Sequence, residues 1–413
     1  MSRKFVTVAD YRRRAEARLP RILFDWIDGG AGDEKGLLEN RSVYDDFRFL
    51  PRYLLDVRGL SPARRLFGRE MAFPFGISAT GYSGLFRPGA DLMLAGAAQE
   101  AGVPFMLSGT SCSSIEDAAR VAPDALWYQL YVAGEIDITR DLIRRADAAG
   151  CHALVVTVDI PVEAPRERDI RNGFAFPPKF SPQVVLDGMM HPAWSLRYLM
   201  SGGMPMMDNW KPYAPEGSTA VQVAQFANAN AYCVQTWEHL EMFRELWPRK
   251  LIVKGVMHPA DAKRAVAMGV DGIIVSNHGG RQFDRSVVAP LLIPGLRRVL
   301  GPDVPIMLDG GIRRGADILM AMCLGADFVL GGRATLFGAV VNAKAGARDV
   351  LRILRTELET LMGQVGCLSL DDPDIADFMV RPDGTPALEG MVRWPDLEAA
   401  ERPEHIKKHG ALA

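Results

Sequence analysis

Eight short apolar segments recur along the chain with helix-like stretches between them, and this alternation constrains the fold more than any other feature. Each segment is nearly continuous in its apolar character, as expected of strands that are buried on both faces of a parallel sheet. The eight segments span residues 73–79, 104–109, 126–132, 153–159, 251–256, 272–278, 305–311 and 328–333.

The stretches between these segments have the character of helices that end at glycine. Residues 90–102, 139–150, 259–269 and 315–325 each close with Gly just before the next strand, which is a helix-stop signal. Eight strand–helix units predict an α/β fold of the TIM (β/α)8 barrel type, formed by residues 1–413 as a single domain. A doubly wound sheet is the competing architecture, but no GxGxxG follows the first strand.

Three parts of the chain fall outside this repeat. Residues 1–70 are expected to form an N-terminal helical segment that closes one end of the barrel, and residues 349–366 are expected to form the last outer helix. Roughly ninety residues separate the fourth and fifth strands, whereas the other connections take about twenty. The sequence therefore predicts a long loop insertion at 174–232.

The bulk composition excludes several classes of protein. A net charge of −2 and a pI near 6.4 give no electrostatic reason to expect a nucleic-acid partner. The five cysteines are scattered and contain no CxxC pair, which favours reduced thiols in a cytoplasmic protein over disulfides or a metal site. The N-terminus lacks the apolar core of a signal peptide, and no apolar run has the length of a membrane span.

Polar residues stand at the carboxyl ends of the predicted strands, where barrel enzymes keep their chemistry. One such residue is more often a cap or a hydrogen-bonded core group than a functional residue. Eight ends that converge on one rim instead predict a concave site lined with donors and acceptors. These residues are Thr80, Ser108, Gln129, Tyr131, Thr157, Asp159, Lys254, Ser276, His278, Asp309 and Arg333.

Glycine-rich loops, LDGGIRRG and LGGRAT, follow the last two predicted strands. In TIM barrels these loops commonly bind a phosphate, because glycine lets backbone N–H groups approach it and a helix N-terminus favours its charge. Arg313 and Arg333 would add charge-assisted hydrogen bonds. Glycines that only make tight turns are the alternative, and the presence of two such loops favours a phosphate site.

The stretch SNHGGRQFD, residues 276–284, places an imidazole at the end of the sixth strand. His278 can act as a general base because imidazole titrates near neutral pH. Asp159, at the end of the fourth strand, would orient the ring and stabilise its cationic form. A purely structural histidine is the alternative.

Cationic side chains near the same strand ends predict an anionic ligand. Arg281 and Arg166 bring two guanidinium groups toward one pocket, and a substrate carboxylate is the simplest partner for both. A surface ion pair of Arg166 with Glu167 or Asp169 is the alternative. Lys254 is compatible with a Schiff-base lysine or with a fixed positive charge beside an anionic cofactor.

The motifs SNHGGRQFD, LVVTVD, WYQLYV, IVKG, LDGGIRRG and LGGR together resemble those of the FMN-dependent 2-hydroxy acid dehydrogenase/oxidase family. The resemblance extends from LPRILFDWIDGGAGDE to QVGC, and VVLDGMMHPAWSL and RERDIRNGF are most similar to its mandelate-oxidising branch. It implies FMN as cofactor and oxidation of an (S)-2-hydroxy acid to the 2-oxo acid. The base would remove a proton either from the hydroxyl, with hydride transfer, or from C2, with formation of a carbanion.

The resemblance also implies a role for each site residue. His278 would be the base, paired with Asp159. The substrate would contact Trp26, Gly81, Thr110, Tyr131, Arg166, His278 and Arg281. The cofactor would contact Ala79, Thr80, Gly81, Ser108, Gln129, Thr157, Lys254, Ser276, Asp309, Gly310, Gly311, Arg313, Gly332 and Arg333.

Three positions depart from the family pattern. Trp26 stands where a tyrosine usually contacts the substrate carboxylate. Its indole N–H would have to replace the tyrosine hydroxyl as the hydrogen-bond donor. Thr110 replaces the tryptophan of glycolate-type oxidases, and Gly81 replaces the alanine typical of oxidases. The last two changes predict a roomy pocket for an aromatic substrate, and Gly81 favours a dehydrogenase.

The insertion at 174–232 bears on partners and location. It is rich in Met and contains Trp194 and Trp210, a composition suited to contact with a membrane interface. The resemblance implies a quinone or another electron carrier as acceptor, a cytoplasmic protein peripheral to the inner face of the membrane, and a homotetramer. The alternative for the segment is a lid packed on a neighbouring subunit.

Three other functions remain as alternatives. The first is an oxidase of the same family that uses O2. The second is a Schiff-base lyase built on Lys254, which would leave His278, Arg281 and Arg166 without a role. The third is a catalytically silent barrel that binds membranes or proteins, which the intact set of polar residues disfavours.

Overall fold

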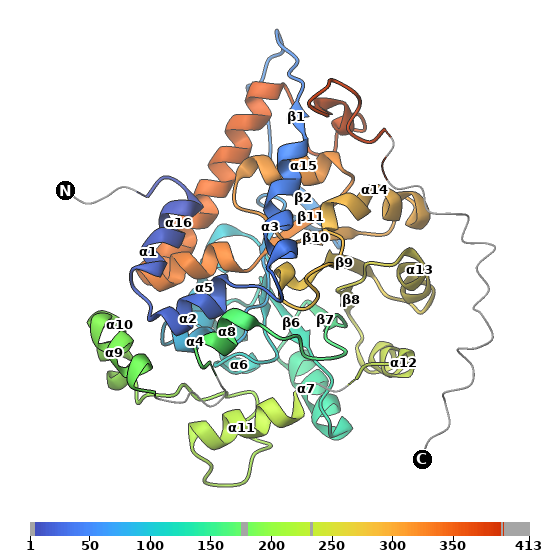
Figure 1. Ribbon diagram of the computed structural model, residues 1–413. Coiled ribbons are helices and arrows are strands. Elements are labelled where there is room, and N and C mark those ends of the chain that lie inside the picture. Colours follow the sequence, from blue (N-terminus) through green and yellow to red (C-terminus); the bar gives the residue numbers. More distant parts are fainter. Residues whose placement is uncertain (1–4, 175–180, 232–233, 390, 392–413) are drawn as a thin grey trace.

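Eight parallel strands close into a barrel in the computed structural model, which confirms the predicted TIM architecture (Figure 1). The structure describes residues 5–174, 181–231, 234–389 and 391. The strands are hydrogen-bonded in the cyclic order β10-β11-β4-β5-β6-β7-β8-β9. Their bounds are β4 (Phe75–Ile77), β5 (Phe105–Leu107), β6 (Leu126–Leu130), β7 (Ala153–Thr157), β8 (Lys250–Lys254), β9 (Gly272–Ser276), β10 (Ile306–Asp309) and β11 (Phe328–Gly331).

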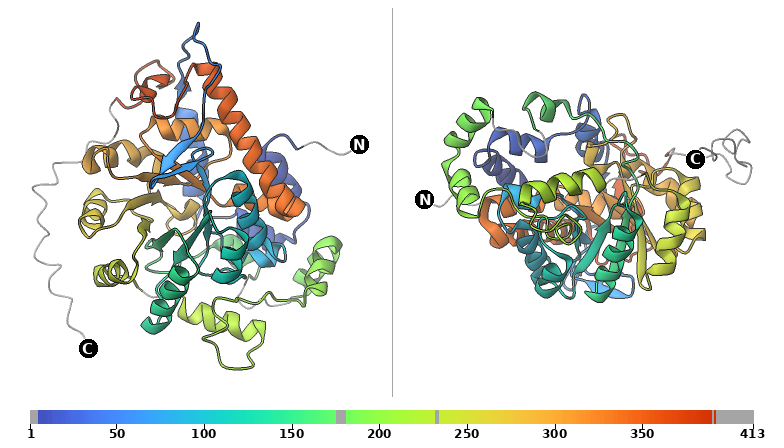
Figure 2. Two further views of the ribbon diagram at one scale, coloured as in Figure 1. Left: turned by 180° about the vertical axis from the view of Figure 1, so that it is seen from behind. Right: turned by 90° about the horizontal axis from the view of Figure 1, so that it is seen from below.

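A helix follows each strand and packs on the outside of the barrel (Figure 2). A short helix, α4 (Ser83–Phe86), precedes the first of them. The outer helices are α5 (Ala90–Ala101), α6 (Ile115–Val121), α7 (Ile136–Ala148), α12 (Trp237–Leu246), α13 (Pro259–Ala267), α14 (Ala289–Leu300), α15 (Gly315–Cys323) and α16 (Arg333–Val365).

The last of these helices is longer than the sequence predicted. Helix α16 begins directly after β11 and runs through Asn342 and Ala343, whose φ/ψ values are non-helical and mark a kink. The prediction covered only the part after this kink. The first part begins at the glycine-rich loop, where the sequence analysis expected a helix N-terminus but assigned no range to the helix.

The core consists of two hydrophobic clusters. One fills the space between strands and outer helices, and the other fills the barrel interior, where Trp127, Ile252, Met307 and Phe328 are buried. A hairpin of β2 (Arg64–Leu66) and β3 (Arg69–Met71) belongs to the second cluster. Phe67 at its turn packs against Trp127 with ring centroids 6.0 Å apart. The hairpin therefore closes the amino end of the barrel.

The N-terminal segment is divided between the two ends of the barrel. Helices α1 (Val8–Glu16), α2 (Arg21–Asp28) and α3 (Lys35–Ser42) precede the short η1 (Val43–Asp46) and β1 (Arg48–Phe49). The carbonyl of Ile27 in α2 accepts a hydrogen bond from Arg333 Nε at 2.8 Å, which places α2 at the carboxyl end of β11. The N-terminal segment is thus helical in its first part, with α2 at the mouth, and it also contains the hairpin, which closes the far end.

The predicted long insertion after β7 is present, and it is largely helical. It contains α8 (Glu167–Arg171), α9 (Pro182–Met190), α10 (Pro192–Met200) and α11 (Ala220–Asn230), while its residues 175–180 and 232–233 lie outside the described part. Helices α9 and α10, bright green in the figures, project from one side of the barrel (Figures 1 and 2). Side-chain caps at Ser181 and Thr219 begin α9 and α11, so the helices carried local signals in the sequence.

Candidate active site

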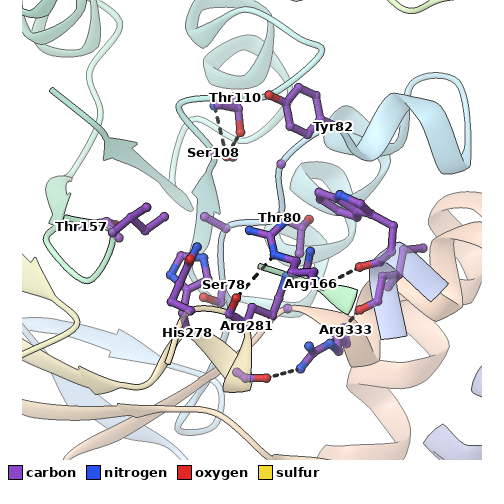
Figure 3. Close-up of a pocket in the computed structure, with 18 of the residues that line it drawn as sticks. Ser78, Thr80, Tyr82, Ser108, Thr110, Thr157, Arg166, His278, Arg281 and Arg333 are labelled. Carbon is purple, nitrogen blue, oxygen red and sulfur yellow. Dashed lines mark hydrogen bonds between the residues drawn. The ribbon is translucent and has the colours of Figure 1, made fainter. Parts of the chain in front are cut away.

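A cavity of about 400 Å³ opens at the carboxyl ends of the strands, where the sequence predicted a site (Figure 3). Of the expected site residues, Asp159 and Ser276 do not line this cavity but contact residues that do. The expected residues that line it are Trp26, Ala79, Thr80, Gly81, Ser108, Thr110, Gln129, Tyr131, Thr157, Arg166, Lys254, His278, Arg281, Asp309, Gly310, Gly311, Arg313, Gly332 and Arg333.

His278 and Asp159 form a hydrogen-bonded pair at the cavity. Their Nδ1 and Oδ1 atoms lie 2.9 Å apart, which leaves the other ring nitrogen for a ligand. His278 has a left-handed backbone conformation, with φ of 56°, and such conformations cost non-glycine residues about 1–3 kcal/mol. Gly255 makes room for the pair, because a Cβ at this position would lie 2.6 Å from Cβ of Asp159.

The charges around this pair favour a neutral imidazole beside an ionised carboxylate. Burial lowers the pKa of His278, the carboxylate of Asp159 opposes this shift, and the nearby Lys254 ammonium adds to it. Burial acts to raise the pKa of Asp159, but His278 and Lys254 outweigh it and the pKa is lowered. At neutral pH the ring can therefore accept a proton, and Asp159 would stabilise the resulting cation.

Arg281 and Arg166 bring two guanidinium groups to one side of the cavity (Figure 3). Arg281 Nη2 is buried and has no hydrogen-bond partner among the described residues. Burial, followed by the charges of Arg166 and Arg333, lowers the pKa of Arg281 well below its usual value. A buried cation under these conditions fits an anionic ligand, since a carboxylate would supply the missing partner.

Helix α8 holds Arg166 at the cavity and not at a surface ion pair. Arg168 of this helix forms ion pairs with Asp25 at 3.4 Å, with Asp28 at 3.5 Å and with Glu34. These contacts fix α8 against α2. Arg166 Nε then donates to the Arg281 carbonyl at 3.4 Å, so the two arginines are joined through the backbone.

Lys254 forms a buried ion pair at the base of the cavity. Its Nζ lies 2.9 Å from Asp309 Oδ2 and 3.3 Å from Ser276 Oγ, and the side chain is only 5% exposed. Burial opposes its charge, but Asp309 and Asp159 outweigh this effect and raise its pKa. An amine held in the protonated form is a poor nucleophile, which disfavours the Schiff-base alternative.

The two glycine-rich loops form a cationic corner of the cavity. Burial, with the charge of Arg333, lowers the pKa of Arg313 to about 9, and burial also lowers the pKa of Arg333 to about 10. Gly311 has φ of 78°, and a Cβ there would meet the Asn40 carbonyl at 1.8 Å. Only glycine builds this turn, and a phosphate would balance the buried charges beside it.

Unpaired polar atoms on the opposite side of the cavity fit the polar edge of a flavin ring. Gln129 Nε2 and Thr157 Oγ1 are buried and lack a hydrogen-bond partner within the described chain. Buried polar groups are nearly always paired, so these atoms indicate a ligand with matching acceptors and donors. The cavity thus offers a phosphate corner, a polar edge and a lysine–aspartate pair, and these features fit FMN.

Gly81 and Thr110 face each other across the wall of the cavity. A Cβ at Gly81 would lie 2.4 Å from Thr110 Oγ1, so an alanine would require the threonine to move. The hydroxyl groups of Thr110 and Ser108 are 3.1 Å apart. Glycine at this position therefore lets a polar threonine occupy the wall.

The sequence analysis missed several lining residues. Tyr82 and Phe174 are aromatic, Asp169 places a buried carboxyl near Arg166 and Arg281, and Asn228 comes from α11 of the insertion. The positions of Tyr82, next to Gly81, and of Phe174, within RERDIRNGF, were signals that could have identified them. Nothing local in the sequence marks Asn228, because α11 reaches the cavity only through the fold.

Comparisons with known proteins agree with this geometry. The family model described as FMN-dependent dehydrogenase matches residues 15–378. The chain is 40% identical to an (S)-mandelate dehydrogenase of Pseudomonas putida over 92% of its own length and 93% of that protein. It is 38% identical to a putative L-lactate dehydrogenase of Mycobacterium tuberculosis, over 89% and 87% of the two chains.

Solved structures give the same result. A crystal structure of (S)-mandelate dehydrogenase, described as a monotopic membrane protein, superposes with a TM-score of 0.87 at 38% identity and covers 92% of this chain and 100% of the other. A mandelate oxidase with (S)-4-hydroxymandelic acid superposes with a TM-score of 0.77 at 33% identity, over 90% and 98% of the two chains. Dehydrogenases and oxidases thus share this barrel.

Proposed function

Since this chain belongs to the FMN-dependent dehydrogenase family, we propose that it oxidises an (S)-2-hydroxy acid with an aryl side chain to the 2-oxo acid. One observation carries the proposal: two guanidinium groups, those of Arg166 and Arg281, share one cavity with His278, which is hydrogen-bonded to Asp159 behind it. The names of the relatives support the substrate class, because they include mandelate and lactate dehydrogenases.

In the proposed reaction, Arg166 and Arg281 bind the substrate carboxylate. This contact orients the substrate so that its hydroxyl-bearing carbon lies near His278. The free ring nitrogen of His278 removes a proton, and Asp159 stabilises the imidazolium that forms. FMN, when bound, would supply the acceptor for the two electrons and for the second proton that the substrate loses. The substrate pocket is completed by Tyr131, Gly81, Thr110 and Trp26.

The cofactor roles inferred from the resemblance remain proposals, and the cavity supports them. Arg313, Arg333 and the glycines of both loops would hold the phosphate. Lys254 would place a fixed positive charge beside the flavin, with Ser276 and Asp309 holding the lysine and the ribityl chain. The polar edge of the ring would be bound by Thr80, Ser108, Gln129 and Thr157, and the backbone of Ala79 would face the ring.

The visible spectrum tests the function directly. We expect the purified protein to show oxidised-flavin bands that bleach when (S)-mandelate is added without oxygen, because the substrate reduces the flavin. Bands that bleach with lactate but not mandelate would contradict the aryl preference. Protein that binds no FMN would contradict the proposal as a whole.

The same experiment distinguishes dehydrogenase from oxidase. We propose a quinone or another electron carrier as acceptor, since Gly81 stands where oxidases typically have alanine. The bleached flavin should then recover rapidly with a soluble quinone and slowly with air. Rapid peroxide formation on admission of oxygen would favour the oxidase alternative.

We also propose that α9 and α10 bind the surface of a membrane. Their exposed apolar residues, which we call the α9–α10 patch, are Val185, Leu186, Met189, Met190, Leu196, Leu199 and Met200. Exposed apolar surface of this kind is typical of an interaction site, and a relative with this fold is described as a monotopic membrane protein. None of the helices in the described residues is long and apolar enough to cross a membrane.

The two tryptophans of the insertion do not belong to this patch. Trp210 is buried, with its Nε1 donating to the Gly109 carbonyl at 2.8 Å, and Trp194 Nε1 donates to the Leu85 carbonyl at 3.0 Å. They tie the insertion to the barrel. The sequence analysis expected methionine and tryptophan to make the membrane contact; the proposal now rests on methionine, leucine and valine, and not on the two tryptophans.

A double substitution tests the membrane proposal. Leu186→Glu combined with Leu199→Glu should abolish cosedimentation with anionic lipid vesicles, because it places two charges in the apolar face. Leu38→Glu is the matched control, since Leu38 on α3 is 62% exposed but lies outside the patch. Equal vesicle binding by the double variant and the control would contradict the proposal.

The assembly and location complete the proposal. We infer a cytoplasmic homotetramer that is peripheral to the inner face of the membrane. Light scattering of the protein in detergent measures the assembly, and a monomeric mass would overturn it.

A further inference from the structure

Trp26 lies in a cluster of aromatic rings at the edge of the cavity. Its ring centroid lies 5.3 Å from that of Phe86 in a stacked arrangement, 5.9 Å from that of Phe174 and 6.0 Å from that of Tyr82 in an edge-to-face arrangement. These rings come from two parts of the chain, Tyr82 and Phe86 from α4 and its N-cap and Phe174 from the segment after α8, and they fix the orientation of the indole. The cluster presents a rigid aromatic surface to the ligand.

The guanidinium of Arg281 packs on the face of the same indole ring. The Arg281 Cζ atom lies 4.6 Å from the centroid of the Trp26 ring, well within the range of a cation–π interaction. Arg281 Nη1 also donates to the backbone carbonyls of Trp26 and of Gly29, the latter at 3.0 Å. Trp26 thus contacts this arginine through both its ring and its backbone.

No carboxylate in the described parts of the chain lies within 4.0 Å of the Arg281 guanidinium. Two carbonyls and the indole face contact it directly, and the Asp169 carboxylate, farther away, offsets part of the repulsion of the neighbouring Arg166 and Arg333. The remaining Nη2 is available for a ligand. An aromatic face holds a cation without neutralising it, so the indole positions Arg281 and leaves its charge to pair with an incoming anion.

We propose that Trp26 is a positioning and specificity residue, which holds Arg281 for the substrate carboxylate through the face of its indole ring and contributes the same ring to the wall that packs against an aryl group. This inference rests on the proposed function and deepens it. Tyr82 and Phe174, which also line the cavity, extend the wall. This arrangement uses the face of the indole and not its N–H, the donor that the sequence analysis considered.

Binding of two unreactive carboxylates by the FMN-loaded enzyme tests the inference. Phenylacetate and propionate correspond to an aryl and a methyl 2-hydroxy acid without the hydroxyl, and perturbation of the flavin spectrum measures their Kd. Trp26→Leu should raise the Kd of propionate by about 5–30-fold through loss of the cation–π contact. The Kd of phenylacetate should rise by about a further 2–10-fold through loss of the aromatic wall.

Kinetics separate positioning from general damage. Trp26→Leu should raise KM for (S)-mandelate in parallel with the Kd and change kcat by less than about threefold, because the His278–Asp159 pair is untouched. Trp26→Phe retains a ring face and should recover most of the affinity. Trp237→Leu is the matched control. Trp237 of α12 makes the same kind of contact, with Arg264 Cζ 4.3 Å from its ring centroid, but it lies outside the cavity lining.

The outcomes distinguish this inference from the function on which it rests. Unchanged Kd values in Trp26→Leu, or a loss of kcat at constant KM, would overturn the inference alone. Equal rises in Kd for phenylacetate and propionate would contradict the role of Trp26 in the wall that packs against an aryl group. A wild-type enzyme that binds neither carboxylate and whose flavin is not bleached by any 2-hydroxy acid would overturn the proposed function and, with it, the inference.

Discussion

Replacement of His278 by glutamine should lower kcat for (S)-mandelate by about 10²–10⁴-fold, the usual contribution of a positioned general base. The glutamine amide can still donate to Asp159, so the pocket should keep its shape and its flavin. Anaerobic stopped-flow measurement of flavin bleaching gives the rate directly. A variant that bleaches within tenfold of the wild-type rate would show that another group removes the proton.

The pH profile supplies an independent test of the same residue. The pKa of His278 is lowered from its usual value near 6.5, so the ring is neutral above its pKa and becomes an inactive imidazolium below it. The wild-type kcat/KM should therefore be flat at neutral pH and fall at a pH below 6.5. This fall should be absent from His278→Gln. His152→Gln is the control, since His152 bonds to the Pro123 carbonyl, away from the cavity, and should leave rate and profile unchanged.

Replacement of Lys254 by methionine should lower the free energy of unfolding by about 3–5 kcal/mol, because it leaves Asp309 as a buried carboxylate without its counter-charge. Urea denaturation monitored by circular dichroism measures this loss. The variant should also reduce its flavin more slowly, since the proposed fixed charge beside the cofactor is gone.

The same strand provides a matched control for this prediction. Lys250 begins β8 and pairs with Asp271 at 2.8 Å, but its side chain is 46% exposed, and exposed ion pairs contribute only about 0–1 kcal/mol. Lys250→Met should therefore lower the free energy of unfolding far less than Lys254→Met does. Adding Asp309→Asn to Lys254→Met should recover part of the loss. Equal losses of unfolding free energy in the two single variants would contradict the conclusion that Lys254 forms a buried ion pair.

The barrel was predictable from the sequence because its signals are local. Eight apolar runs and the glycines before them identify strands and helix ends, and the residues after each strand must meet at one rim. The hairpin of β2 and β3 was missed because its strands have three residues each, too few for a periodic pattern. The insertion was predicted, but its helices were not, because its length was given more weight than its Ser and Thr caps.

The residue types of the site were predictable, but their mutual contacts were not. His278 and Asp159 stand 119 positions apart, and only the closed barrel brings them within hydrogen-bonding distance. The contact between Trp26 and Arg281 depends on the packing of α2 against the mouth, which no local pattern reports. Trp210 was misplaced for the same reason, because a tryptophan suits a membrane interface and a protein core equally well.

The hairpin at the amino end has a consequence for turnover. With that end sealed by packed side chains, the cavity is reached from the rim bordered by α2 and α8. Hydroxy acid, oxo acid and electron acceptor would then use a common entrance and occupy it one after another. Because these molecules would share one entrance, the order in which they bind and leave would depend on access to the cavity as well as on their chemical reactivity.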